Sequence, residues 1–180
     1  MNEARNARAG AAGVAHPAHD AIVGLGANIG DPAARLSAAR QALAALPDTV
    51  LMRASSLYRT APVGYTEQPD FLNAVCWLKT DLAPAALAAA LFALEQRLGR
   101  VRGALRDGPR VIDLDLLYYE GVESEGPNLR LPHPRLHERA FVLYPWAEIL
   151  PDFRIPGQGV VRELCAGVEG QRVERLPGAW

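Results

Sequence analysis

The sequence predicts an α+β domain with a ferredoxin-like βαββαβ core: an antiparallel sheet with helices on its faces, followed by a C-terminal extension. Segments with strand character and segments with helical periodicity occur in the order strand–helix–strand–strand–helix–strand, the split pattern of ferredoxin-like domains. The 180 residues also match the usual length of one domain. Because no internal repeat or interdomain linker is evident, we assign residues 21–180 to a single domain.

The first strand and the first helix are predicted within residues 21–46. Residues 21–26 (AIVGLG) form a short apolar run that ends in glycine and is typical of a strand. Asp31 suits the N-cap of the following helix, and Pro32 suits its first position. The residues of its apolar face recur at helical spacing: Leu36, Ala39, Leu43 and Leu46.

Two further strands are predicted over residues 50–60 and 73–80. The segment between them contains Pro62, Gly64 and Pro69 and is too long for a tight hairpin. We therefore expect a long loop at one end of the sheet.

The second helix is expected to begin at Pro84 and to run to about Leu98. Residues 110–120 (RVIDLDLLYYE) then form the fourth strand. The rest of the chain adds a shorter helix-and-strand portion, which completes the extension.

Composition indicates a globular protein without a basic surface for nucleic acid. The formal net charge is −1 and 49% of the residues are hydrophobic. Cys76 and Cys165 form no CxxC pair, which fits a reducing compartment. Residues 1–20 lack the apolar block of a signal peptide and are interpreted as a disordered tail. We expect a cytoplasmic monomer that binds neither nucleic acid nor membrane.

Two acids on the fourth strand predict a metal site. Asp113 and Asp115 are two residues apart, so their side chains share one face and their Cα atoms lie roughly 6.5 Å apart. Ile112, Leu114 and Leu116 point to the other face and can pack on helices. Two unpaired carboxylates would repel each other and lose hydration, which divalent cations prevent. Oxygen ligands favour Mg²⁺, and two ions about 4 Å apart can clamp phosphates.

An arginine-rich loop precedes these acids. Arginine binds phosphate bidentately, so a glycine- and proline-containing loop rich in it is typical of an anion clamp. Acids that bind metal beside such a loop indicate phosphoryl transfer. In the alternative interpretation, Asp113 and Asp115 merely pair with arginines of the loop. The four arginines are Arg100, Arg102, Arg106 and Arg110.

Aromatic and amide side chains predict a site for a flat heterocycle. Phe71 and Asn73 lie on one face of the third strand, and Phe141 follows the arginine- and histidine-bearing segment. Each phenylalanine alone would be interpreted as core, but with Asn73 the pair could sandwich a heterocycle and bind its polar edge. Asn28 could simply precede the first helix. His133, between two prolines, is expected to contact a ligand.

Several motifs together resemble one known family. GANIGD, SSLYRTAPVG, QPDFLNAV, GPRVIDLDLLYY and LPHPRLHERAFVLYPWAEI occur in this order from about Ile22 to Pro151. They are similar to the motifs of the hydroxymethyl-dihydropterin pyrophosphokinases. The resemblance implies transfer of pyrophosphate from ATP to the hydroxymethyl group of 6-hydroxymethyl-7,8-dihydropterin, with release of AMP and with two Mg²⁺, in folate biosynthesis.

The resemblance also implies a role for each matching residue. It assigns the two Mg²⁺ to Asp113 and Asp115, which act in catalysis together with Arg100 and Arg110. Ala27, Phe71 and Asp107 stand where members of the family often carry serine, tyrosine and tryptophan. The residues implied in ATP binding are Glu95, Arg102, Arg106, His133 and Arg139. The residues implied in pterin binding are Thr60, Val63, Phe71, Asn73 and Phe141.

The expected reaction is attack of the pterin hydroxyl on the β-phosphorus, inside a site that the loops 61–71 and 100–110 close. Two other classes remain open from the residues alone. A non-catalytic ferredoxin-like module would bind a small ligand without Mg²⁺-dependent ATP binding. A DxD nucleotidyltransferase would release pyrophosphate, whereas the pyrophosphokinase reaction releases AMP.

Overall fold

A mainly antiparallel sheet forms the centre of the computed structural model, which describes residues 18–101, 108–127 and 129–180. In this part of the chain the sheet has six strands in the order β10-β3-β4-β1-β5, with β2 also paired to β4. The strands are β1 (His19–Ala27), β2 (Thr49–Ala54), β3 (Tyr58–Thr60), β4 (Phe71–Thr80), β5 (Asp113–Tyr119) and β10 (Val173–Arg175). This order confirms the ferredoxin-like core.

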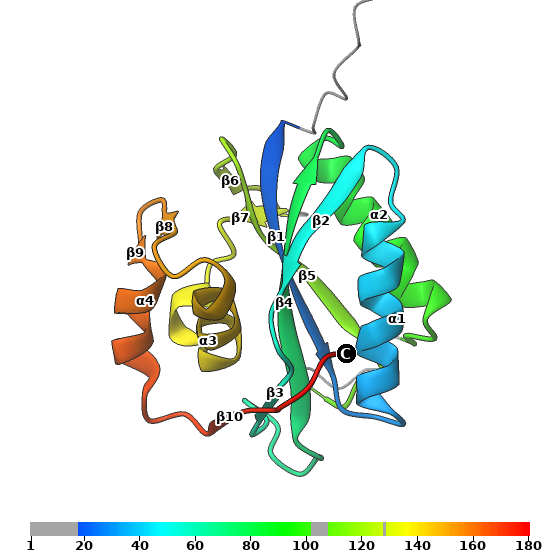
Figure 1. Ribbon diagram of the computed structural model, residues 1–180, viewed down its shortest axis with the longest axis vertical. Coiled ribbons are helices and arrows are strands. Elements are labelled where there is room, and N and C mark those ends of the chain that lie inside the picture. Colours follow the sequence, from blue (N-terminus) through cyan, green and yellow to red (C-terminus); the bar gives the residue numbers. More distant parts are fainter. Residues whose placement is uncertain (1–17, 102–107, 128) are drawn as a thin grey trace, which may run out of the picture.

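Helices cover both faces of the sheet (Figure 1). One face carries α1 (Pro32–Ala44) and α2 (Pro84–Arg97), and the other carries α3 (Ala140–Ile149), with α4 (Val161–Leu164) packed on the outer side of α3. The remaining short elements belong to the loops and the extension. They are the strand pairs β6 (Ser124–Glu125) with β7 (Arg130–Leu131) and β8 (Arg154–Ile155) with β9 (Gly159–Val160), and the 3₁₀ helices Leu136–Glu138 and Cys165–Val168.

The alternation of side chains along the strands produces two hydrophobic cores, one on each face. Val23 and Leu25 of β1 pack in the same core as Leu43 of α1. Ile22, on the opposite face, belongs to a second core that includes Trp146 of α3. The sheet is therefore the middle layer of the domain, with helices packed on each of its faces.

The start of α1 confirms the prediction from the sequence. The Asp31 side chain accepts a hydrogen bond from the backbone N–H of Ala34 at 3.0 Å, and Pro32 is the first helical residue. This is the ordinary way to satisfy a free amide at a helix N-terminus. The buried residues Leu36, Ala39 and Leu43 confirm the predicted apolar face.

The segment predicted as one strand over residues 50–60 is two strands, so that prediction was wrong in detail. At the break, Ser55 Oγ accepts a hydrogen bond from Val75 N at 3.0 Å, and Ser55 N donates to Val75 O at 2.9 Å. The serine side chain replaces a ladder bond between backbones, which lets β2 and β3 diverge along β4.

The tail predicted over residues 1–20 overlaps by two residues with β1, which begins at His19. His19 and Asp20 belong to β1 and pair with Thr80 and Lys79. Asp20 accepts a hydrogen bond from Trp77 Nε1 at 2.7 Å and forms an ion pair with Lys79 at 3.0 Å, which extends the strand. Residues 1–17 lie outside the described part of the chain.

None of the helices among the described residues has the length and apolar character required to cross a membrane.

Candidate active site

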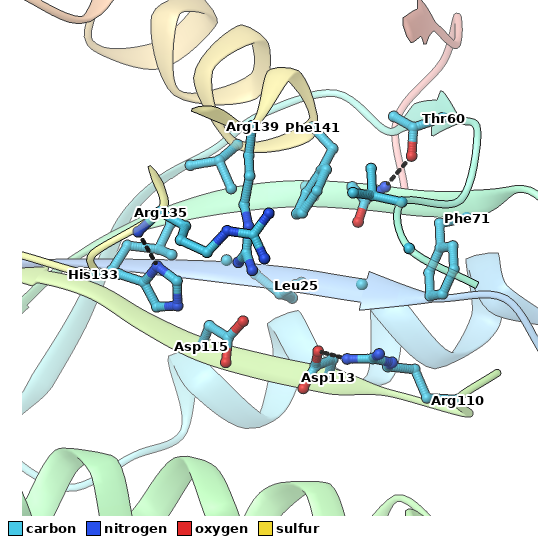
Figure 2. Close-up of a pocket in the computed structure, with 18 of the residues that line it drawn as sticks. Leu25, Thr60, Phe71, Arg110, Asp113, Asp115, His133, Arg135, Arg139 and Phe141 are labelled. Atoms are coloured by element: carbon cyan, nitrogen blue, oxygen red, sulfur yellow. Dashed lines mark hydrogen bonds and ion pairs between the residues drawn. The ribbon is translucent and has the colours of Figure 1, made fainter. Parts of the chain in front are cut away.

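A cavity of about 390 Å³ opens on the sheet face that carries α3 (Figure 2). Its walls come from β1, from β3 and β4 with the loop between them, from β5, and from the segment that leads into α3. The volume lies within the usual range for a site that binds a small molecule. The residues predicted from the sequence that line it are Thr60, Val63, Phe71, Asn73, Arg100, Arg110, Asp113, Asp115, His133, Arg139 and Phe141.

The two acids of β5 face this cavity together, as the strand alternation predicted. Leu114 and Leu116 point to the opposite face and join the core beneath α2, with Ile112. A single strand thus presents a polar face to the cavity and an apolar face to the helices.

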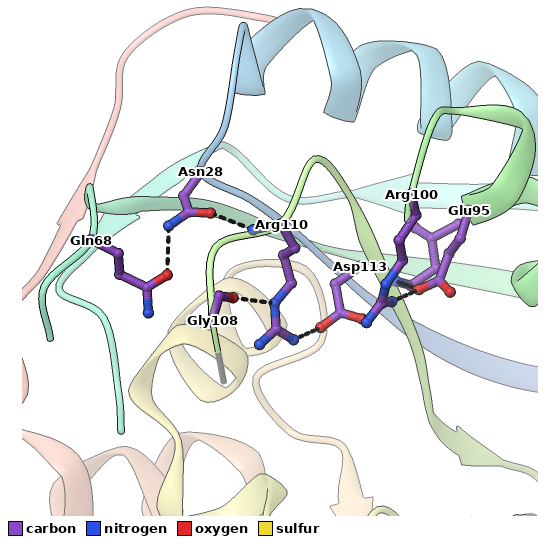
Figure 3. A network of polar contacts seen from close by, with 8 residues as sticks. Asn28, Gln68, Glu95, Arg100, Gly108, Arg110 and Asp113 are labelled. Carbon is purple, nitrogen blue, oxygen red and sulfur yellow. Dashed lines mark hydrogen bonds and ion pairs between the residues drawn. The ribbon is translucent and has the colours of Figure 1, made fainter. Parts of the chain in front are cut away.

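Asp113 is paired with both arginines that flank the loop. Nη1 of Arg100 and Nη1 of Arg110 each contact one of its carboxylate oxygens, the latter at 2.5 Å (Figure 3). Burial alone would raise the pKa of Asp113, but the neighbouring guanidinium groups of Arg110 and Arg100 outweigh it and lower the pKa. For Asp113, pairing with arginines is therefore what this structure shows.

Asp115 has a different environment. No hydrogen bond or ion pair from the described residues reaches its carboxylate. Burial, and then the negative charge of Asp113, raise the pKa of Asp115 to about 7. Within the described residues, Asp115 is thus the acid without a paired cation, although the positive charge of Arg139 opposes the rise in its pKa.

Glu95 supports the site from behind and is not among the residues that line the cavity. Its side chain is buried on α2, with 4% of its surface exposed. It accepts a hydrogen bond from Leu114 N at 2.7 Å and pairs with Arg100. Burial raises the pKa of Glu95, against the opposing effect of that backbone bond. In this structure it holds Arg100 and the start of β5.

His133 and two arginines form the other end of the cavity (Figure 2). His133 N donates to Leu117 O at 2.8 Å, and Nδ1 of His133 accepts from Arg135 N at 3.3 Å. Burial, with Arg139 and Arg135, lowers the pKa of His133 to about 4. The imidazole is therefore neutral at pH 7, and the bond to Nδ1 leaves Nε2 as the protonated nitrogen.

Arg135 was missed by the sequence analysis, although it follows His133 by two residues in the same proline-rich segment. Arg135 lies in a loop, where the direction of a side chain cannot be predicted from strand alternation. The structure places it among the residues that line the cavity, beside Arg139.

The aromatic end contains the predicted heterocycle residues. Phe71 and Phe141 both line the cavity, from β4 and from α3. Asn73 is buried, and its Nδ2 donates to Thr60 Oγ1 at 2.8 Å. This bond fixes the amide and leaves its carbonyl oxygen as an acceptor.

Gly26 is a second residue that the sequence analysis missed. It pairs with Asn73 across β1 and β4, and a Cβ atom at Gly26 would lie 2.9 Å from Asn73 Oδ1. Glycine is therefore required for the close approach of the amide. The presence of Gly26 in the apolar segment AIVGLG was the signal in the sequence that could have indicated this close approach.

Asn28 connects two loops rather than simply preceding α1 (Figure 3). Its Nδ2 donates to Gln68 Oε1 at 2.9 Å and to Pro69 O at 3.0 Å. Its Oδ1 accepts from Arg110 N at 2.8 Å. One buried side chain thus links the β3–β4 loop to the end of the arginine loop. Arg102, Arg106 and Asp107 lie outside the described residues.

Asp113 and Asp115 are the carboxylates of the cavity that could bind Mg²⁺. Among the described residues, no group of three or more His, Cys, Asp and Glu side chains could hold a metal ion. Mg²⁺, however, is commonly held by one or two carboxylates and completes its shell with water and phosphate oxygens. Asp115, which has no ion-pair partner in the described part of the chain, and Asp113 on the same face of β5 fit such a site if a nucleotide supplies the remaining oxygens.

Comparisons with known proteins identify one family that this chain resembles over most of its length. The family model described as 7,8-dihydro-6-hydroxymethylpterin-pyrophosphokinase matches residues 22–151. The 2-amino-4-hydroxy-6-hydroxymethyldihydropteridine pyrophosphokinase of Pseudomonas aeruginosa is 45% identical over 157 residues, covering 87% of this chain and 96% of the relative. The enzyme of the same name from Methylorubrum extorquens is 47% identical over 156 residues, covering 87% and 98%.

Solved structures show the same fold at low sequence identity. An HPPK-DHPS crystal structure in complex with substrates has a TM-score of 0.65 and 11% identity over 83% of this chain. A Plasmodium falciparum HPPK-DHPS structure has a TM-score of 0.66 and 13% identity over 91%. The chain spans 43% and 48% of the length of those two proteins.

Proposed function

The chain belongs to the 7,8-dihydro-6-hydroxymethylpterin-pyrophosphokinase family, and from this premise we propose that it transfers the pyrophosphoryl group of ATP to 6-hydroxymethyl-7,8-dihydropterin, with release of AMP, in folate biosynthesis. One observation carries the proposal. A single cavity joins an end with acids and arginines to an end with two phenylalanines and a buried amide. The first suits a triphosphate and the second a flat heterocycle.

The aromatic end would bind the pterin. Phe71 and Phe141 would stack on the ring, which is the favoured contact between flat π systems. Asn73 would accept a hydrogen bond from a ring N–H through Oδ1, because its Nδ2 is already bonded to Thr60. Backbone groups near Thr60 and Val63 would complete the polar edge.

The basic end would bind the triphosphate. Arg100 and Arg110 pair with Asp113 here, and we propose that they exchange this carboxylate for phosphate oxygens when ATP enters. His133, Arg135 and Arg139 would contact the same nucleotide from the opposite side of the cavity. Arg102 and Arg106 are retained as proposed members of the clamp. Guanidinium groups suit both partners because they form bidentate bonds to carboxylate and to phosphate.

That exchange would release Asp113 to hold Mg²⁺ together with Asp115. We propose two ions. When bound, Mg²⁺ would neutralise phosphate charge and lower the pKa of the pterin hydroxyl. The protein residues would align that hydroxyl with the β-phosphorus, since phosphoryl transfer depends mainly on position and on neutralised charge.

The cavity is built from one chain, so we propose that a monomer is sufficient for activity. We also propose that the reaction takes place in the cytoplasm.

Product analysis tests the proposal. The protein is incubated with ATP, Mg²⁺ and the reduced pterin, and nucleotides and pterins are separated by chromatography. We expect AMP and a pyrophosphorylated pterin in equal amounts. Release of pyrophosphate would indicate a nucleotidyltransferase instead, and absence of Mg²⁺-dependent turnover would contradict catalysis.

A further inference from the structure

The N-terminus of α3 is capped from a distant part of the chain. Arg139 occupies the N-cap position and makes no capping hydrogen bond through its side chain. Gln171 supplies the missing partner: its Oε1 accepts from Ala140 N at 3.0 Å, and its Nε2 donates to Glu138 O at 2.8 Å. One amide thus holds the peptide groups on both sides of Arg139 and satisfies an amide that a helix leaves free.

Gln171 is itself held by the strand that follows it. Val173 of β10 pairs with Thr60 of β3, and Arg172 O accepts a hydrogen bond from Ala61 N at 3.3 Å. Thr60 in turn holds Asn73 through Oγ1 at 2.8 Å. The C-terminal segment therefore connects the strand that positions the buried amide to the start of α3.

Phe141, one residue after Ala140, lies between two cavities. It lines the main cavity and also a smaller one of about 140 Å³, whose walls include Val63 and Gln171. Because the Phe141 side chain borders both cavities, we infer that the backbone at the start of α3 decides toward which cavity the ring points. A phenylalanine has only two side-chain torsions to correct a shifted backbone, whereas the longer Arg139 has more.

We propose that Gln171 is a positioning residue for the pterin: by holding the backbone at Glu138 and Ala140, it keeps Phe141 in the main cavity against the heterocycle. This inference rests on the proposed function, in which Phe141 stacks on the pterin. It assigns a role in substrate binding to the segment 171–175, none of whose residues lines the main cavity.

A double-mutant cycle tests the proposal. The dissociation constant of the reduced pterin is measured for the wild-type protein, Gln171→Ala, Phe141→Leu and the double variant. We expect Gln171→Ala to raise the Kd about tenfold in the wild-type background, the scale of a lost hydrogen-bonded pair. In the Phe141→Leu background it should change the Kd by less than about twofold, because the residue through which it acts is gone.

Three controls make the result specific. Gln171→Glu keeps the acceptor for Ala140 N but loses the donor for Glu138 O, so its Kd should be intermediate. Gln41→Ala removes an exposed glutamine of α1 and should leave the Kd unchanged. The Tm of each variant separates a loss of global stability from a loss of affinity.

An unchanged pterin Kd in Gln171→Ala, or equal effects in both backgrounds, would overturn the role of Gln171 while the proposed function stands. A wild-type protein that binds no reduced pterin would overturn both. Gln171→Ala with a lower Tm and the wild-type Kd would show that the amide is only structural, and would also overturn the proposal.

Discussion

Asp113 and Asp115 are neighbours on one face of β5, and their surroundings shift their pKa values in opposite directions. Asp113 forms ion pairs with the guanidinium groups of Arg100 and Arg110, and these charges lower its pKa despite burial. Asp115 is buried beside that negative charge, and its pKa rises to about 7. Among the described residues, arginines thus pair with Asp113 and none forms an ion pair with Asp115.

This contrast predicts opposite effects of two similar substitutions on stability. Since the pKa of Asp115 is raised in the folded protein, its favourable contribution is complete below its ordinary value of 3.8 and is lost as pH rises through about 7. Asp115→Asn should therefore stabilise the free protein at pH 8, by about 1–2 kcal/mol or about 2–8 °C in Tm. It should also flatten the dependence of Tm on pH between 4 and 7.

Asp113→Asn should do the reverse. The pKa of Asp113 is lowered, so its contribution is present above its ordinary value of 3.8 and is lost as the solution becomes more acidic. Its removal leaves Arg100 and Arg110 without a shared counter-charge and should lower stability at pH 8 by about 1–3 kcal/mol. Thermal unfolding across pH 3–9 checks both variants. Equal Tm changes for the two would contradict the account.

A substitution of Arg110 tests whether this residue acts on the phosphates or on the pterin. Its guanidinium pairs with Asp113 and lies 5.8 Å from the centre of the Phe71 ring. Arg110→Ala should lower kcat about 100-fold, the scale of losing one group that stabilises charge in a transition state. The pterin Kd should rise much less. Arg97→Ala, at an exposed position of α2, is the matched control. A change confined to pterin affinity would show that Arg110 does not act on the phosphates.

At the scale of elements, the antiparallel pair β1–β4 positions the side-chain amide of Asn73, which we propose binds the pterin. Gly26 and Asn73 are direct partners in this pair, and a side chain at Gly26 would meet Asn73 Oδ1. The direction of the Asn73 amide thus depends on the absence of a side chain at Gly26 as well as on the hydrogen bond to Thr60.

Gly26→Ala should therefore raise the pterin Kd by about tenfold, because Asn73 must move to accept the added methyl group. The affinity for an ATP analogue should change by less than about twofold, since the side chains that we propose bind the triphosphate lie on elements other than β1 and β4. Gly167→Ala, where an added Cβ has open space, serves as the control. Isothermal titration of each ligand gives both constants, and equal losses for the two ligands would count against a local effect.

The sequence predicted those elements whose signals are local. Asp31 and Pro32 marked the start of α1, and the alternation around Asp113 and Asp115 gave the direction of both acids. It did not predict the break at Ser55, because the serine replaces a bond of a strand twenty residues away. The linking role of Asn28 and the capping role of Gln171 were not predicted for the same reason, because their partners lie on segments remote in sequence.

At the scale of the whole molecule, the sheet separates a supporting layer from the layer that carries the site. The core beneath α1 and α2 contains the buried Leu43, whereas the cavity and α3 lie on the other face. Stability and substrate binding should therefore respond to different substitutions.

Leu43→Ala tests this separation. Removing a fully buried leucine should lower the free energy of unfolding by about 2–5 kcal/mol. Well below its Tm, the variant should keep the pterin Kd within about twofold of the wild-type value. Chemical denaturation and ligand titration at the same low temperature measure both quantities. A large change in Kd without loss of stability would mean that the two layers are coupled.

The most direct measurement is a crystal structure with Mg²⁺, a non-hydrolysable ATP analogue and the reduced pterin. We predict Mg²⁺ bound by Asp113, Asp115 and phosphate oxygens, with Arg100 and Arg110 moved from Asp113 to the phosphates. This prediction would be contradicted by a nucleotide-bound structure in which both arginines still pair with Asp113 and no metal ion lies beside Asp115.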